Sequence, residues 1–451
     1  MNNFNRRSFL KSSSILAGAT LVTPSLISCQ NPNSKLNIAA IGSGGKGYDI
    51  THDWASGERV IALCDVHPDK SDVLNTRKKY PNANVYLDYR EMLDNEKDLD
   101  AVTVSTPDHT HGIIASNAMN RGLHVYVQKP LTHNIEEARA LTKIAAKNKV
   151  VTQMGNQAHT GTYSNQFREW VKNDVIKNVT EVDAWKGPSC FFMQKDKRIN
   201  DWPKKEPKPE GMDWDLWLGP AEHHPFSRMY HTFEWRGFHP YGSGMLGDWG
   251  CHIIDMIHHY LDLGLPTEIN AQRMDDHNKV IFPLNSHMEF KFPARGKHPG
   301  LKLNWKDGVN CQASIPKKYW DNPVKAPRLG GAGTLFKVGG EDYMIQRNSH
   351  GGSSRLIPYE KSKDLDLKTE NIREDHSESF IQACLGNGKT WSPFSVGGLL
   401  TQVLTLGCIA QYYNRNIKFD PKTKQITNDN LANARLSIKP RQGWEEFYKI
   451  A

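Results

Sequence analysis

Two aspartates and two histidines fall on one side of a predicted helix over residues 247–261. At about 100° per residue they lie within roughly 60° of one another, and they are Asp248, His252, Asp255 and His259. Apolar side chains occupy the other side, so the pattern predicts one amphipathic helix through the whole stretch. An aspartate and a histidine one turn apart suit proton transfer, because an imidazole titrates near neutral pH and a nearby carboxylate favours its charged form.

A solvated polar face is the ordinary alternative for such a stripe. Exposed helix faces normally carry Lys, Arg or Glu for solubility and helix propensity. None of these three residue types occurs from 237 to 267. The stretch therefore favours an enclosed site, and a hydrogen-bonded core position for His252 is the structural alternative.

A second constellation begins with an apolar, β-branched run at 36–41, which predicts a buried strand. The spacing G-x-G-x-x-G follows, in which Gly42 permits a tight turn, Gly44 lets a pyrophosphate approach the backbone, and Gly47 lets a helix pack closely. A second strand, 59–64, ends on Asp65, whose carboxylate can accept hydrogen bonds from the adenosine ribose and would repel a 2′-phosphate. The stretch predicts NAD rather than NADP, against the alternative of an ordinary glycine-rich loop.

Strand and helix patterns alternate from 36 to about 155, which predicts an α/β fold with a doubly wound parallel Rossmann sheet. Further strands are expected at 101–105, 123–127 and 150–154, and helices at 110–121 and 134–147. Asn134 and Glu137 suit the start of the second helix as a capping pair. Ligands of such sheets bind beyond the carboxyl ends of the strands, so one crevice should be lined by the residues that follow them, Asp65, Thr106, Lys129 and Asn156.

The pattern changes after residue 156, because crossover helices between strands become rare. Strands are expected at 181–185, 267–274, 287–292 and 301–305, helices at 164–172, 376–386 and 396–414, and long loops at 186–219 and 330–354. An open, mainly antiparallel sheet in an α+β domain fits this order. We therefore expect a signal and tether at 1–34, an NAD-binding Rossmann domain at 35–155, and a substrate-binding and oligomerisation domain at 156–451.

The first thirty residues have the features of a targeting segment. Residues 5–11 (NRRSFLK) resemble a twin-arginine export signal, and an apolar run at 15–27 follows that is too short to span a bilayer. The run ends in LISC, which resembles a lipobox that is cut before Cys29. The segment predicts export to the periplasm with a lipid anchor on Cys29 as the sole membrane contact; a tail on a cytoplasmic enzyme is the alternative.

Composition excludes several classes of function. The formal charge of +8 includes three basic residues of the leader, Arg6, Arg7 and Lys11, so the remainder carries +5. There is no basic helix and no zinc-type spacing, so no nucleic-acid partner is expected. Six cysteines remain besides Cys29, none in C-x-x-C spacing, and neither a metal centre nor a disulfide framework is expected.

Four motifs stand in an order that resembles the Gfo/Idh/MocA family of sugar and polyol oxidoreductases. They are the glycine loop with Asp65, residues 105–111 (STPDHTH), residues 128–130 (QKP), and Asp248 four residues before His252. The resemblance covers 36–160 and 235–265 well. It implies that Lys129, Asp248 and His252 surround the reacting carbinol. Gln128 stands where the family usually has glutamate, which puts in doubt any role that needs a carboxylate there.

The reaction that the resemblance implies assigns a role to each of these groups. His252 would take the hydroxyl proton as general base. Asp248 would favour the imidazolium, and Lys129 would place a positive charge beside the developing alkoxide. A surface position before a turn is the structural alternative for Lys129.

The predicted contacts form two sets. The cofactor set is Gly42, Ser43, Gly44, Gly45, Gly47, Asp65, Ser105, Thr106, Pro107, His111, Gln128, Lys129 and Asn156. The substrate set is His159, Trp235, Arg236, Tyr241, Asp248 and His252. Aromatic side chains such as Trp235 could stack on sugar rings, although packing explains most tryptophans.

Three functions fit the residues. The leading hypothesis is an NAD-dependent enzyme that oxidises a ring hydroxyl of a sugar or glycoside to a keto-sugar. The second is redox-neutral glycoside cleavage by oxidation and elimination; known NAD-dependent glycosidases resemble this fold, but their tripeptide departs from the Lys-Pro found here. The third is a non-catalytic sugar- or cofactor-binding lipoprotein. An exported enzyme would have no free nicotinamide pool, so we expect tightly held, recycled cofactor and a homo-oligomer.

Overall fold

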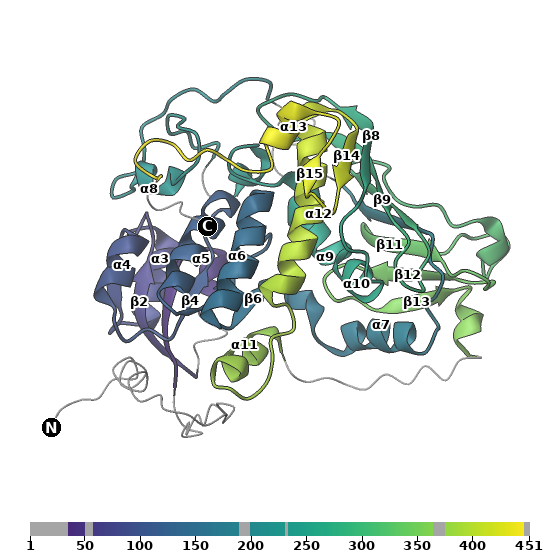
Figure 1. Cartoon of the computed structure of the whole chain (residues 1–451), viewed down its shortest axis with the longest axis horizontal. Coiled ribbons are helices and arrows are strands. Elements are labelled where there is room, and N and C mark those ends of the chain that lie inside the picture. Colours follow the sequence, from purple (N-terminus) through teal and green to yellow (C-terminus); the bar gives the residue numbers. More distant parts are fainter. Residues whose placement is uncertain (1–34, 50–56, 189–198, 231–232, 364–374, 446–451) are drawn as a thin grey trace, which may run out of the picture. The chain divides into compact units, whose positions relative to one another are not determined.

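The computed structural model describes residues 35–49, 57–188, 199–230, 233–363 and 375–445. The chain divides into two units, 1–34 and 35–451. The predicted export signal and Cys29 therefore lie outside the described residues. Figure 1 shows the helices and strands in chain order.

The N-terminal sheet has six strands, all parallel, in the order β3-β2-β1-β4-β5-β6. The strands are β1 (Asn37–Ile41), β2 (Arg59–Cys64), β3 (Asn84–Tyr86), β4 (Ala101–Val104), β5 (His124–Val127) and β6 (Thr152–Met154). This order reverses between β1 and β4, which is the point at which doubly wound sheets bind dinucleotides. The Rossmann prediction is confirmed.

Four helices pack against this sheet: α3 (Ser71–Lys79), α4 (Tyr89–Asn95), α5 (Asp108–Asn120) and α6 (Ile135–Asn148). Asn134 caps the N-terminus of α6, as predicted. Its side chain accepts a hydrogen bond from the Glu137 backbone N–H at 3.0 Å. A further helix begins at Lys46, directly behind the glycine loop.

The second sheet has nine strands in the order β13-β12-β11-β7-β10-β9-β8-β14-β15. The strands are β7 (Glu181–Lys186), β8 (Glu268–Asp275), β9 (Asn285–Phe292), β10 (Leu301–Asp307), β11 (Ala332–Lys337), β12 (Met344–Asn348), β13 (Ser354–Ile357), β14 (Ile417–Asp420) and β15 (Gln425–Ile426). Only the β7–β10 pair is parallel among these neighbours. A mainly antiparallel sheet was expected, and it is confirmed.

The prediction of a long loop at 330–354 is wrong, because this segment contains β11, β12 and the first residue of β13. Its glycines mark the turns between these strands instead. Gly340, with φ +82°, lies between β11 and β12, and Gly351, with φ +70°, lies between β12 and β13. Glycine density here signals hairpins rather than an irregular segment.

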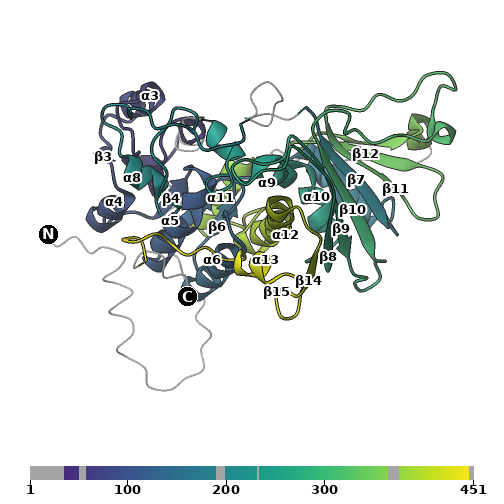
Figure 2. The same ribbon diagram turned by 90° about the horizontal axis from the view of Figure 1, so that it is seen from above.

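The remaining helices are α7 (Thr162–Lys172), α8 (Trp214–Leu218), α9 (Gly244–Ile253), α10 (Asp255–Tyr260), α11 (His376–Cys384), α12 (Phe394–Tyr413) and α13 (Asn430–Ala434). Short 3₁₀ turns occur at Gln157–His159, Glu234–Gly237, Lys317–Tyr319 and Tyr359–Lys363. Figure 2 shows α9, α10 and α12 along one face of the second sheet. Helix α12 has the length and composition of a membrane span, but 72% of its apolar window is buried, and it contacts α6, α9 and β8 as a core helix.

The single helix predicted over 247–261 is instead two helices, with a break at Ile254 between α9 and α10. Ile254 has helical backbone angles, φ −87° and ψ −22°, and its N–H donates to Gly250 O at 2.9 Å, so the hydrogen-bonded path continues through the break. The four polar side chains are divided by the partners they contact. Asp248 and His252 belong to α9, whereas Asp255 and His259 belong to α10.

Candidate active site

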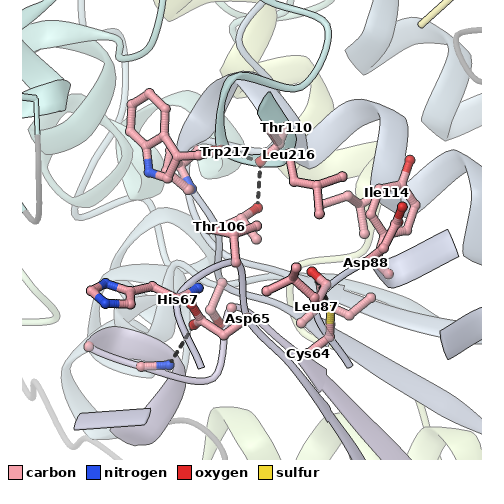
Figure 3. Close-up of a pocket in the computed structure, with 18 of the residues that line it drawn as sticks. Cys64, Asp65, His67, Leu87, Asp88, Thr106, Thr110, Ile114, Leu216 and Trp217 are labelled. Carbon is pink, nitrogen blue, oxygen red and sulfur yellow. Dashed lines mark hydrogen bonds between the residues drawn. The ribbon is translucent and has the colours of Figure 1, made fainter. Parts of the chain in front are cut away.

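A crevice opens at the carboxyl ends of β1, β2 and β4 (Figure 3). Seven residues of the predicted cofactor set line it: Gly42, Gly44, Gly45, Asp65, Ser105, Thr106 and Pro107. Glycine is required at two loop positions, because a Cβ on Gly42 would lie 2.8 Å from the Ser105 carbonyl and one on Gly47 would lie 1.7 Å from the Gly42 oxygen. The loop is therefore a backbone cradle of the kind that admits a pyrophosphate.

Asp65 lies at the end of β2 inside this crevice. Its carboxylate accepts hydrogen bonds from the backbone N–H of Gly44 at 3.2 Å and of His67 at 3.0 Å. Burial raises the pKa of Asp65, and these two hydrogen bonds oppose the rise. The N–H of Gly45 donates to Asp72 at 2.7 Å. The cradle and this carboxylate fit a dinucleotide with a free ribose 2′-hydroxyl.

Two residues of the predicted cofactor set are buried in the scaffold. The His111 ring is buried between two backbone carbonyl oxygens, with Nδ1 2.9 Å from Pro130 O and Nε2 2.8 Å from Thr106 O. Burial lowers the pKa of His111 to about 4. Gln128 is also buried, against Gly155. The His111 ring lies between the segment after β4 and the segment after β5, and its contact with the cofactor stays a prediction.

Lys129 and Asp248 come from the two halves of the chain and meet. The Lys129 Nζ donates to the Asp248 carboxylate, and it also lies 3.3 Å from the Asp248 carbonyl oxygen. The Arg236 Nε is 3.7 Å from the same carboxylate. Burial by itself raises the pKa of Asp248, but Lys129 and Arg236 outweigh it, so the net shift is downward and the carboxylate stays ionised. This ion pair joins the end of β5 to helix α9.

His252 lies one turn after Asp248 on α9. Its Nδ1 is buried and has no hydrogen-bond partner among the described residues, which marks a polar atom that the folded chain leaves unpaired. Burial, followed by the charge of Lys129, places the pKa of His252 well below its usual value. The imidazole is therefore neutral at pH 7 and can accept a proton.

His350 is a site residue that the sequence did not indicate. Its ring stacks on the His252 ring at 4.0 Å between centroids, with an interplanar angle of 24°, and it lies 4.8 Å from the Trp249 ring. The Lys186 Nζ is 4.4 Å from the centroid of Trp249. His350 belongs to the turn between β12 and β13, in the stretch expected to be a loop, and nothing in its local sequence connects it with α9.

Asp108 is a second residue that was missed, although it lies inside the quoted motif at 105–111. It is the first residue of α5 and is buried, and its carboxylate accepts a hydrogen bond from the Ser243 hydroxyl at 2.8 Å. Burial raises the pKa of Asp108 to about 7; Arg236 opposes the shift and Asp248 adds to it. A carboxyl group that is half-protonated near neutral pH thus lies close to the Lys129–Asp248 pair.

Asp255 organises a separate buried cluster. Its carboxylate accepts hydrogen bonds from Asn156 Nδ2 and from His159 Nδ1, each at 2.8 Å. All three side chains are buried. Asp255 thus holds one nitrogen of each side chain, and the contacts of Asn156 with cofactor and of His159 with substrate stay predictions. His259 belongs to this cluster, with its ring 5.1 Å from that of His159.

The predicted sugar-stacking residues divide into two groups. Trp235 and Arg236 line the crevice, and the Arg236 guanidinium lies 4.2 Å from the Trp235 ring centroid. Tyr241 is fully buried in an aromatic cluster, 5.1 Å from the ring of Trp217 and 5.3 Å from that of Tyr230. The Tyr241 ring thus packs in the core, and its contact with substrate stays a prediction.

The wall of the crevice includes two distant segments, α8 and the C-terminal stretch that reaches Trp444. Trp444 is 3% exposed, and the Arg90 guanidinium lies 4.7 Å from its ring centroid. Arg441 anchors this stretch through a 2.7 Å ion pair with Asp215 of α8. Trp444 shares the wall with Leu87 and Tyr89, on the side of the crevice near Asp65.

Within the described ranges, no group of three or more His, Cys, Asp or Glu side chains is arranged to hold a metal ion. The five described cysteines are all free; they are Cys64, Cys251, Cys311, Cys384 and Cys408.

Comparison with known families identifies both halves of the chain. Residues 36–156 match the NAD-binding Rossmann domain of the Gfo/Idh/MocA oxidoreductase family, and residues 200–292 match the C-terminal α/β domain of the same family. Two separate parts of the chain thus match two domains of the Gfo/Idh/MocA oxidoreductase family. The N-terminal match is to an NAD-binding domain, as the glycine loop predicted.

Two curated proteins from Shewanella are similar to part of this chain. Glycosyl hydrolase family 109 protein 1 of Shewanella sp. (strain ANA-3) is 29% identical over 212 residues, and the α-N-acetylgalactosaminidase of Shewanella oneidensis is 28% identical over 212 residues. Each alignment covers 41% of this chain and 46% of the relative, so the chain matches about half the length of these curated relatives.

Solved structures show the same fold at low identity. The WlbA dehydrogenase from Bordetella pertussis, solved with NADH and UDP-GlcNAcA, is 12% identical with a TM-score of 0.57, covering 86% of this chain and 99% of that one. The aldose-aldose oxidoreductase from Caulobacter crescentus is 15% identical with a TM-score of 0.53, covering 86% and 100%.

Proposed function

We propose that this protein is an NAD-dependent oxidoreductase that oxidises a ring hydroxyl of a sugar or glycoside to a keto-sugar, or catalyses the reverse reaction. The observation that carries the proposal is the contact between Lys129 and Asp248 beside the neutral imidazole of His252. These groups lie where the Rossmann half, which would hold the nucleotide, meets the second half. Bound NAD supplies the two-electron acceptor.

The three side chains divide the proton chemistry. His252 takes the proton of the reacting hydroxyl, because it is the unpaired neutral base of the cluster. Lys129 places its ammonium beside the oxygen as negative charge develops there. Asp248 orients that ammonium through the ion pair and favours the imidazolium that forms on His252.

Product analysis tests this function directly. Protein incubated with a panel of mono- and disaccharides and NAD should yield a product two mass units below one of the sugars, and the His252→Ala variant should not. Absence of any keto-sugar across the panel in both directions of reaction would contradict the proposal.

Redox-neutral cleavage of a glycoside is the second candidate function. The names of the Shewanella relatives favour it, since they are called glycosyl hydrolases. The Lys-Pro pair at 129–130, which places the Lys129 ammonium against Asp248, favours the first candidate. A chromogenic glycoside separates the two, because release of the aglycone without accumulation of a keto-sugar supports cleavage.

We further propose that the protein is exported by its N-terminal residues, is attached to a membrane through a lipid on Cys29, and works in the periplasm with tightly held NAD. Cell fractionation of wild type and Cys29→Ser tests this localisation: the wild type should sediment with membranes, and the variant should be soluble.

We also propose a homo-oligomer. Lys302 and Lys306 alternate with buried Leu303 and Trp305 on β10, so one face of the second sheet is polar and uncovered by α9 and α12. Light scattering of the purified protein would contradict this proposal if it gave the mass of a single chain.

A further inference from the structure

A second cavity of about 440 Å³ lies away from the nucleotide crevice and shares none of its lining residues. It is formed by the C-terminal half of α12, the segment 239–243 before α9, and the stretch around α13. Nothing in the proposed reaction uses it.

Three cations, Lys279, Arg435 and Lys439, and one carboxylate, Glu222, line this cavity. The Arg435 guanidinium lies 3.7 Å from the centroid of the Tyr412 ring, and the Lys279 Nζ lies 4.1 Å from the same centroid. No carboxylate of the described residues is within 4.0 Å of Lys279 or Arg435, whereas the neighbouring Arg415 is paired with Asp429 at 2.8 Å. Two positive charges thus share one aromatic ring without a counter-ion.

A buried histidine adds an unpaired polar atom. His239 lines the cavity and is 3% exposed, and its Nε2 is buried with no hydrogen-bond partner among the described residues. The positive field is visible in the neighbouring groups. Burial lowers the pKa of His133 to about 4, and the positive charge of Arg435 lowers it further. Burial and, after it, the charge of Arg435 also lower the pKa of Lys279. The lining therefore carries an excess of positive charge, which attracts anions.

We propose that this cavity binds a small organic anion, a carboxylate or phosphate group carried on a body the size of a sugar. Arg435 and Lys279 supply the charge for the anionic group, and the volume falls within the range of small-molecule pockets. The aromatic side chains of the lining, among them Trp202 and Phe282, suit the ring face of the body.

The cavity adjoins both segments that carry the proposed catalytic groups. His133 lies four residues after Lys129, and its Nε2 is 3.0 Å from His239 O and 3.2 Å from Gly242 O. Ser243, which also lines the cavity, donates to Asp108. An anion bound here would therefore contact the back of the active site without entering it.

Calorimetric titration of the full nucleotide-loaded protein tests the proposal. We expect glucuronate or glucose 6-phosphate to bind with a Kd below about 1 mM, and neutral glucose to bind at least tenfold more weakly at this site. Arg435→Gln should weaken the anion at least tenfold, whereas Arg415→Gln, the matched control on a cation already paired with Asp429, should leave the Kd unchanged.

Three outcomes would overturn the proposal: no binding of either anion, equal binding of glucose, or equal affinity in the wild type and in Arg435→Gln. The last result would place the anion in the crevice of the active site instead. If Arg435→Gln fails to fold, Lys279→Gln gives the same comparison, because it removes the second cation that lies over Tyr412.

Discussion

At the scale of single residues, His252 differs from an ordinary buried histidine in having an unpaired ring nitrogen next to an ion pair. We expect His252→Ala to lower kcat by about 100-fold or more, because a positioned general base contributes that much to proton transfer. The Kd of NAD should stay within twofold of the wild type, since His252 does not line the nucleotide crevice.

Steady-state kinetics with the sugar identified from the panel measures kcat, and tryptophan fluorescence measures NAD binding. His298→Ala removes a partly exposed imidazole far along the chain and serves as the matched control. Undiminished kcat in His252→Ala would remove this residue from the mechanism.

Asp108 should make stability depend on pH. Its folded pKa of about 7 lies above the value of about 4 for an unfolded aspartate, so the folded chain binds more protons than the unfolded chain between these values. Its contribution to stability is therefore present in acid and is lost as the pH rises through 7. Relative to Asp108→Asn, the free energy of unfolding of the wild type should fall by up to about 1.4 kcal/mol per pH unit between pH 5 and 6.5.

Urea denaturation of both proteins at several pH values measures this slope. Asp98→Asn, at an exposed aspartate, should retain the pH dependence of the wild type. Parallel stability curves for wild type and Asp108→Asn would show that Asp108 ionises normally.

At the scale of elements, the break between α9 and α10 separates a chemical pair from a structural one. Asp255 begins α10 and holds Asn156 and His159, which belong to the segment after β6. This cluster therefore fastens the second half of the chain to the Rossmann sheet, whereas Asp248 on α9 remains with Lys129.

We expect Asp255→Ala to lower the free energy of unfolding by about 3 kcal/mol, because two buried donors would lose their acceptor. Urea denaturation measures the loss. Asp94→Ala removes a 66% exposed carboxylate that is paired with Arg121, and it should change stability by less than about 1 kcal/mol. A loss of similar size in both variants would contradict the structural role of Asp255.

At the scale of the whole molecule, the nucleotide crevice depends on a chain segment almost 400 residues away from the glycine loop. The C-terminal stretch is fixed to α8 by Arg441 and brings Trp444 against the crevice. Trp444 is therefore placed to contact a bound nucleotide, which fits the proposal that the protein retains its cofactor.

We expect Trp444→Ala to accelerate the release of NAD about tenfold, which corresponds to roughly 1.4 kcal/mol of lost contact. Absorbance and mass spectrometry measure the amount of nucleotide that remains bound to Trp444→Ala and to the wild type after dialysis. Trp320→Ala is the matched control, since Trp320 packs in another core cluster and bonds to Ile315 O. Equal retention in all three proteins would remove the C-terminal stretch from cofactor binding.

The sequence by itself determined the Rossmann half and the main polar groups of the site. Strand β2 spans residues 59–64 as predicted, and the glycine spacing required a cradle because Gly42 and Gly47 have no room for a side chain. These features depend on short-range chemistry that one stretch of chain contains completely. Lys129, Asp248 and His252 could be named because motif spacing is also local.

Only the tertiary structure decided which of the polar side chains meet. The burial of Tyr241, the pairing of Asp255 with His159, and the stacking of His350 on His252 each join segments that are far apart in the sequence. Periodicity reports which face of an element is apolar, but it contains no information about what covers that face. Burial and hydrogen-bond partners depend on long-range packing, and they separate the groups that do chemistry from those that hold the fold.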